Sequence, residues 1–186
     1  MRDEDVEGVG ARLLGDALRP AEEVEKVAQK GGIVMVTIGS MFLEQKVVDE
    51  FVTKRAALLP RIQELEREHA NDKKKRDKAI SDLMDTIKLT PASWTSAVDH
   101  IERILKIGGP EAAGIGTDFD GIDDPPQGLE DISKLPKITE ELLRRGHAES
   151  VVRGVLGENF LKFWDRAEAA RAKVPAREGP LPFSKP

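Results

Sequence analysis

The sequence predicts a helix-rich α/β fold with two parallel strands, and three observations support it. Residues 33–38 form a continuous, mostly β-branched apolar run, which is typical of a strand covered on both faces. Residues 113–117 form a second short apolar run that leads directly into a turn. The stretch between the two runs has helical periodicity, so together they are typical of an enlarged βαβ crossover.

The first helix is expected over residues 21–30, because Val24, Val27 and Ala28 recur at helical spacing and Pro20 suits the first turn. Gly31 and Gly32 follow, and they are expected to end this helix before the first strand. After that strand, a charged stretch predicts two helices joined near Asn71, which would form an inserted hairpin over about residues 41–90.

The C-terminal half is also expected to be mainly helical. A helix entry at residues 90–93 predicts a helix that stops at Gly108 and Gly109, ahead of the second strand. A loop rich in Pro and Gly covers residues 123–136, and an amphipathic helix follows over 138–145. Residues 150–172 predict one or two more helices, with six apolar side chains directed inward: Val151, Val155, Leu156, Phe160, Leu161 and Trp164.

Only two strands are predicted against five or six helices. A parallel sheet of two strands leaves an unpaired edge on each side, which is not a stable arrangement by itself. The sequence therefore predicts that further strands complete this sheet.

Composition excludes several classes of function. A net charge of −5 argues against a nucleic acid or an anionic membrane as the main partner, and the single basic run, residues 73–76, is flanked by acidic residues. The chain has no cysteine, which excludes disulfides, thiolate catalysis and cysteine zinc sites. No apolar run reaches membrane-spanning length and the N-terminus is acidic, so we expect a cytoplasmic protein without a secretory signal.

Residues 113–121 are the strongest candidate for chemistry. Gly114 and Gly116 would let a backbone or ligand approach the strand, Asp118 would project from its carboxyl end, and Gly121 would permit a positive φ. The alternative is an ordinary turn in which Asp118 and Asp120 accept backbone hydrogen bonds. Calcium-loop and dinucleotide fingerprints both fit poorly, because the glycine spacing is wrong for each.

The other candidate residues give weaker signals. His69, His100 and His147 are far apart in sequence, so a zinc site would have to be assembled across the fold. His100 is best explained as a partly buried helix residue with a hydrogen bond, and the other two as surface residues. Arg19 precedes a helix and could bind a substrate carboxylate through two parallel hydrogen bonds, or could be a surface charge.

Taken together, the motifs resemble the C-terminal portion of the zinc-dependent membrane (renal) dipeptidases. The resemblance covers about residues 11–167 and keeps the order and approximate spacing of the family. The matching stretches are residues 31–36, 98–101, 114–121, 128–134, 140–146 and 159–161.

The resemblance implies a (β/α)8 barrel that hydrolyses dipeptides with two zinc ions. In that family an acid at the end of the eighth strand handles the proton of the attacking water, and Asp118 occupies the matching position. Zinc lowers the pKa of bound water toward about 7, and a nearby carboxylate can accept and return a proton. The resemblance also places Arg19 where the family has an arginine that binds the carboxylate of the substrate.

The chain departs from the family at the metal ligands. The family's ligands are a His-x-Asp on the first strand, a Glu on the third, and histidines on the fifth and sixth, and the sequence matches none of these strands. Gly8 stands where the sixth-strand histidine is expected. A typical barrel needs about 250 residues. The resemblance therefore implies an incomplete (β/α)8 barrel, a truncated form that has no metal ligands and is inactive alone.

The expected organisation is an irregular N-terminus over residues 1–10, a partial barrel over 11–172, and a disordered tail over 173–186. The expected function is that of a zinc metallodipeptidase, with a dipeptide as the substrate of the full-length family. The alternative is a non-catalytic interaction protein or pseudoenzyme that completes its sheet with a partner or with another copy of itself, through exposed strand edges.

Overall fold

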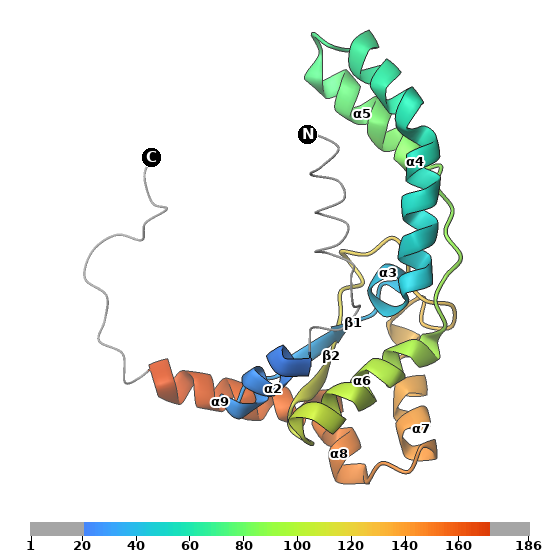
Figure 1. Ribbon diagram of the computed structural model, residues 1–186. Coiled ribbons are helices and arrows are strands. Elements are labelled where there is room, and N and C mark those ends of the chain that lie inside the picture. Colours follow the sequence, from blue (N-terminus) through green and yellow to red (C-terminus); the bar gives the residue numbers. More distant parts are fainter. Residues whose placement is uncertain (1–20, 172–186) are drawn as a thin grey trace, which may run out of the picture.

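A computed structural model describes residues 21–171 and shows a helix-rich α/β fold with a small parallel sheet (Figure 1). Strand β1 (Val34–Thr37) pairs in parallel with β2 (Ala113–Thr117), which confirms the two predicted strands. The register pairs Val34 with Ala113 and Thr37 with Thr117, with a shift near the end because β2 has one residue more over this span. Since the strands are parallel, both carboxyl ends lie at the same edge of the sheet.

Helices make up most of the described chain and follow the predicted order. Before the second strand the helices are α2 (Ala21–Gln29), α3 (Ser40–Leu43), α4 (Gln45–Glu68), α5 (Lys73–Met84) and α6 (Trp94–Gly108). After it come the 3₁₀ helix η1 (Ile132–Lys134), α7 (Pro136–Arg144), α8 (Glu149–Arg153), the π-helical turn η2 (Gly154–Glu158) and α9 (Asn159–Arg171).

Helix α6 organises the core, because it contacts both strands as well as α2, α3 and α7. Its inward side chains include Val98, Ile101 and Ile104, each at most 1% exposed. Ser93 caps its N-terminus by accepting a hydrogen bond from the Thr95 N–H, and Gly109, with a φ of 86°, ends it. The helix entry and stop that the sequence predicted are therefore confirmed.

Helices α4 and α5 pack against each other and project from the rest of the molecule, as Figure 1 shows. Asp72 caps α5 by accepting a hydrogen bond from the Lys75 N–H, so the predicted join near Asn71 is confirmed. The base of the hairpin is closed where Glu50 accepts hydrogen bonds from the N–H and hydroxyl of Thr90. None of the helices within residues 21–171 is both long and apolar enough to cross a membrane.

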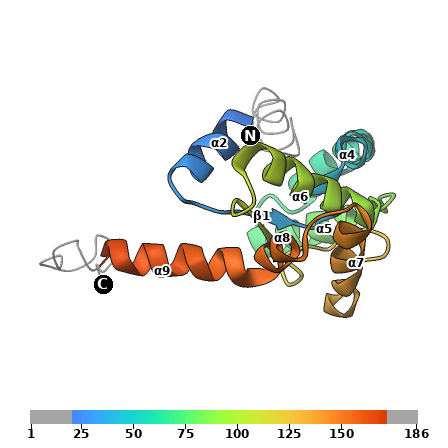
Figure 2. The same ribbon diagram turned by 90° about the horizontal axis from the view of Figure 1, so that it is seen from below.

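The expectation that six apolar side chains after residue 150 point inward is wrong for most of them. Val155 is 1% exposed, but four side chains are between 39% and 63% exposed: Leu156, Phe160, Leu161 and Trp164. After α8 the chain forms the π-helical turn η2. Helix α9 then extends away from the core (Figure 2). Because only the start of α9 meets the sheet, its apolar periodicity does not predict burial.

A network of charged groups joins α6 to α7. The Arg145 guanidinium contacts the carboxylates of Asp99 and Glu102 on α6, at 2.6 Å each, and that of Glu141 on α7 at 2.7 Å. The Arg144 guanidinium donates two further hydrogen bonds to Glu141. These bonds, first from Arg144 and then from Arg145, lower the pKa of Glu141 to about 2.

Stability should therefore depend on the ionisation of Glu141. A carboxyl whose pKa is lower in the folded state stabilises the fold above its ordinary value of 4.5, and this stabilisation is lost as the pH falls toward about 2. We expect Glu141→Gln to lower the melting temperature at pH 7 and to differ less from the wild type at pH 3, where part of the stabilisation has been lost. Glu140→Gln, an exposed neighbour, is the control. An equal deficit of Glu141→Gln at both pH values would contradict this explanation.

Candidate active site

The candidate site lies where the two strands end. Asp118 directly follows β2, and α3 begins three residues after the end of β1. The Ile38 N–H donates a hydrogen bond of 3.1 Å to the carbonyl of Thr117, which extends the pairing of the strands to this edge. Groups at the carboxyl edge of a parallel sheet are well placed to meet a ligand.

The turn after β2 has unusual backbone geometry. Thr117 has a φ of 32° and Asp118 a φ of 67°, and within residues 21–171 no other non-glycine residue has a positive φ. Aspartate tolerates the left-handed region, whereas a β-branched threonine rarely adopts it. Such strain persists only where the surrounding structure imposes it, and it is concentrated at functional sites.

The Asp118 carboxylate is exposed and, among residues 21–171, forms no hydrogen bond or ion pair. It is therefore not the ordinary turn aspartate of the alternative interpretation. The hydrogen bond that Asp118 does form within the described chain is accepted by its main-chain carbonyl, from the Gly121 N–H at 2.9 Å. No hydrogen bond or ion pair within this part of the chain therefore holds the side chain away from a bound molecule.

Gly121 is needed for a different reason from the expected one. Its φ is not among the positive values, so the expectation of a left-handed glycine is wrong. A Cβ atom at this position would lie 2.5 Å from Oδ1 of Asp118. Glycine therefore leaves room for the Asp118 carboxylate above the turn.

The two glycines of β2 also have a structural explanation. A Cβ on Gly114 would lie 2.6 Å from Sδ of Met35, and one on Gly116 would lie 3.1 Å from Cβ of Met35. The close approach expected at these glycines is made by the Met35 side chain at Gly114, and by the Met35 side chain together with the backbone of β1, including the Val36 carbonyl, at Gly116. The glycines accommodate Met35 across the sheet.

The described histidines are not gathered at the site. His100 is 9% exposed, and its Nε2 donates a hydrogen bond to the Leu43 carbonyl, which confirms its structural role. Burial, only partly offset by this hydrogen bond, lowers the pKa of His100. His147 is not a simple surface residue, because its Nε2 lies 2.8 Å from Oε1 of Glu102 on α6. Arg19, the predicted substrate-binding residue, lies outside the described residues.

The residues of the described chain do not fit a metal centre. Among residues 21–171 no three His, Asp or Glu side chains are grouped so that they could hold an ion. The acidic residues nearest to Asp118 in sequence are Asp120 and Asp123, both exposed. No chemical step through a metal follows from these residues.

Sequence reasoning missed Asp124, which joins the Asp118 loop to α3. Its carbonyl accepts a hydrogen bond from the Ser40 N–H and its Oδ2 accepts one from the Met41 N–H, each at 2.8 Å. Burial raises the pKa of Asp124 above its ordinary value, against the effect of the Met41 N–H. No local pattern predicts this contact, because 83 positions separate Asp124 from Met41.

Comparison with known proteins assigns the family. The sequence model of the membrane dipeptidases, peptidase family M19, matches residues 19–178. The chain belongs to this family. The match covers most of the M19 motifs from which the resemblance was inferred, including the turn that carries Asp118.

The fold is similar to that of a solved M19 protein. The crystal structure described as the dipeptidase AC, a metallopeptidase of family M19, superimposes with a TM-score of 0.52 at 17% sequence identity. The similarity covers 78% of this chain and 31% of that chain. This chain therefore corresponds to about a third of the length of the M19 structure, and the likeness concerns the fold.

Proposed function

We propose that this chain forms the C-terminal part of a zinc dipeptidase active site, with Asp118 as the group that handles the proton of the attacking water. The observation that carries this proposal is the Asp118 carboxylate, which forms no hydrogen bond or ion pair within residues 21–171, in a strained turn at the carboxyl end of β2. Membership of the M19 family supplies the substrate class, dipeptides, and the expectation of a metal.

The chemistry available to Asp118 is that of a general base and acid. A carboxylate can accept a proton from water as it attacks a peptide carbonyl, and can then return the proton to the leaving amine. The exposed position of Asp118 and the lack of competing hydrogen bonds among the described residues suit both steps. The room left by Gly121 keeps the carboxylate above the turn. We propose Arg19 as the residue that binds the substrate carboxylate.

The proposed architecture is an incomplete (β/α)8 barrel over residues 11–172, in which β1 and β2 are the last two strands. The hairpin within about residues 41–90 is then an insertion after the first of them. Its two ends meet where Glu50 binds Thr90 and where Glu44 accepts a hydrogen bond from the Ser93 N–H, as expected of an inserted unit. Within residues 21–171 each of the two strands has one edge without a partner strand, and further strands of the barrel would pair at these edges.

The proposed cofactor is zinc, held by ligands that this chain does not supply. We therefore propose that the 186-residue chain alone is inactive. After exhaustive dialysis it should retain less than stoichiometric zinc and should not hydrolyse dipeptides. Addition of a separately expressed polypeptide that corresponds to the remainder of an M19 dipeptidase should produce hydrolysis that a chelator abolishes. Chelator-sensitive hydrolysis by the chain alone would refute the proposed inactivity.

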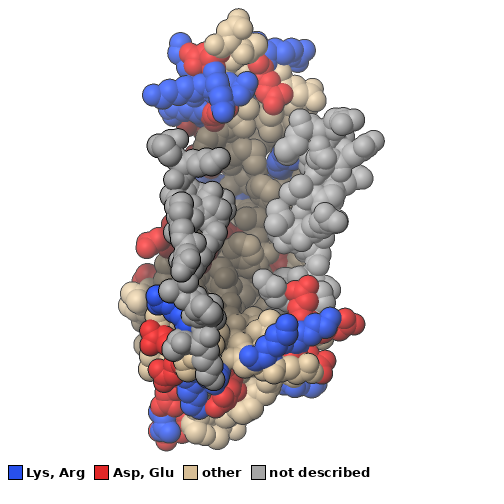
Figure 3. Space-filling view, turned by 90° about the vertical axis from the view of Figure 1, so that its left-hand side faces the viewer, with Lys and Arg blue, Asp and Glu red and all other residues tan. Residues whose placement is uncertain are grey.

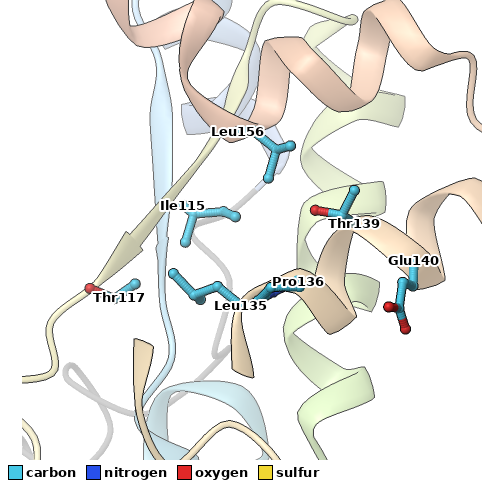
Figure 4. Close-up of a pocket in the computed structure, with 7 residues that line it drawn as sticks. All are labelled: Ile115, Thr117, Leu135, Pro136, Thr139, Glu140 and Leu156. Atoms are coloured by element: carbon cyan, nitrogen blue, oxygen red, sulfur yellow. The ribbon is translucent and has the colours of Figure 1, made fainter. Parts of the chain in front are cut away.

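A second candidate function is that of an interaction protein that completes its sheet with another copy. It is favoured by a hollow of about 500 Å³ beside β2, shown in Figure 4. The hollow is lined by Ile115, Thr117, Leu135, Pro136, Thr139, Glu140 and Leu156. Figure 3 shows one face of the molecule on which charged residues gather mainly at the two ends, while its hollowed middle is largely uncharged.

Self-association through this hollow can be tested at Leu156, which is 46% exposed. If two copies pair there, Leu156→Glu should shift the protein from dimer to monomer in sedimentation equilibrium, because a charge would be buried in the contact. Glu158→Gln, an exposed change in the same turn, should leave the dimer intact. A wild-type monomer with a single cooperative melting transition would rule out this function.

A further inference from the structure

The strained turn at Thr117 and Asp118 needs attachments on both sides. On the strand side, the Thr117 carbonyl accepts a hydrogen bond from the Ile38 N–H. Among the described residues, the backbone and side chains of 118–123 form only one hydrogen bond, and it is internal to the turn, from the Gly121 N–H to the Asp118 carbonyl. The turn would therefore relax unless the chain after it were also held.

After the turn, the chain is held in place at Asp124. Its carbonyl and its carboxylate accept hydrogen bonds from two successive N–H groups, those of Ser40 and Met41, at the start of α3. Between the turn and Asp124, Phe119 and Ile122 are partly buried and pack against the core. Apolar contacts of this kind are not directional, so they do not fix the backbone conformation of the turn. Asp124 is thus the first residue after the turn that is bound to another element by hydrogen bonds.

The start of α3, to which Asp124 is bound, is itself fixed to the core of the protein. Ser40 is fully buried, and its hydroxyl accepts a hydrogen bond of 3.1 Å from the Ala92 N–H, just before α6. A Cβ on Gly39 would lie 3.1 Å from Oδ1 of Asp124, so the chain after β1 passes close to this carboxylate. Asp124 therefore connects the end of β2 to the end of β1 and, through Ser40, to the segment just before the core helix α6.

We propose that Asp124 is a positioning residue that fastens the Asp118 loop to the start of α3 and so holds Asp118 in its left-handed conformation at the edge of the sheet. The meaning of this attachment for catalysis rests on the proposed function. The attachment itself is a property of the 186-residue chain and can be measured without metal or substrate.

The test is nuclear magnetic resonance on the full chain with Asp124→Ala, Asp124→Asn and Asp123→Ala. In Asp124→Ala the Met41 N–H loses its acceptor, so we expect its hydrogen exchange to become about tenfold faster or more. The coupling constant between the amide and α protons of Asp118, which reports φ, should change in the same variant. Exchange in α6, for example at Ile104, should stay slow.

The matched variants separate positioning from simple destabilisation. Asp124→Asn keeps an oxygen that can accept from Met41, so it should restore both slow exchange and the coupling constant of Asp118. Asp123→Ala removes an exposed neighbour and should behave as the wild type. Unchanged exchange at Met41 or an unchanged coupling constant in Asp124→Ala would overturn the proposal, and so would an Asn variant as perturbed as the Ala variant.

If Asp124→Ala does not fold, exchange in the wild-type chain decides the question. In low concentrations of urea, the amides of Met41 and Gly121 should open with the same free energy if one attachment holds both segments. Separate opening free energies would overturn the proposal. If the chain passes these tests but gives no hydrolysis together with the remainder of an M19 dipeptidase, the proposed function is refuted and the attachment is still supported.

Discussion

Replacement of Asn159 by aspartate is expected to destabilise the fold more than any other single change considered for this chain. Asn159 is 2% exposed at the start of α9, and its Nδ2 donates hydrogen bonds of 2.9 Å to the carbonyls of Pro110 and Ala113. A Cβ on Gly154 would lie 2.7 Å from Oδ1 of Asn159, so a glycine makes room for this side chain. The amide thus ties the C-terminal helix to the beginning of β2.

Asn159→Ala would leave two carbonyl groups without this donor, which should cost about 2 to 3 kcal/mol. Asn159→Asp would also place a negative charge beside two carbonyl oxygens, and we expect a loss of more than about 4 kcal/mol. Urea unfolding followed by circular dichroism measures both changes. Asn71→Asp, in the exposed turn of the hairpin, should change stability by less than about 0.5 kcal/mol.

An Asn159→Ala protein as stable as the wild type would show that α9 does not anchor the sheet. The residues 159–161, which belong to the family resemblance, would then need another explanation. With the anchor confirmed, the asparagine of that motif has a structural rather than a catalytic role.

The second large effect is expected at Asp118. In a complex of this chain with the remainder of an M19 dipeptidase, Asp118→Asn should lower kcat for a dipeptide by about 100-fold or more, because the amide cannot accept the proton. Asparagine tolerates a left-handed backbone and is close in size to aspartate, so the turn should be preserved. The zinc content should stay unchanged, since Asp118 is proposed to handle a proton and not to bind the metal.

Asp120→Asn is the matched control, because Asp120 is an exposed carboxylate two residues further along the same turn. It should keep kcat within a few-fold of the wild type. Equal losses of kcat in the two variants would indicate that the total negative charge of the turn supports the reaction, rather than a specific role of Asp118. Loss of zinc together with activity in Asp118→Asn would mean that Asp118 is a ligand, and the proposed role would be wrong.

Most elements were predictable because their signals are local. The β-branched run before Thr37, the cap at Ser93 and the glycine at Gly109 act on their own neighbours, so strand and helix limits follow from short stretches of sequence. Apolar periodicity gave a wrong result after residue 155, where Trp164 and its neighbours are exposed. The same pattern describes a helix that faces the core and one that leaves it, and only packing distinguishes them.

The candidate site was predictable in part. Two acids after a short strand indicated the position of Asp118. The positive φ predicted for Gly121 was wrong, and the contact made by Asp124 was missed. A contact between Asp124 and Met41 depends on two strand ends that meet only after the sheet has formed. The sites of Asn159 and Arg145 have the same origin, since each contacts segments more than 40 positions away.

The sequence by itself indicated most of the secondary structure, the family, and Asp118 as the candidate residue for chemistry. The tertiary structure decided which side chains are buried, which glycines serve as space for a neighbour, and which groups hold the Asp118 turn. The physical reason is range: caps, turns and periodicity act within a few residues, whereas packing and long-range hydrogen bonds depend on how distant segments meet.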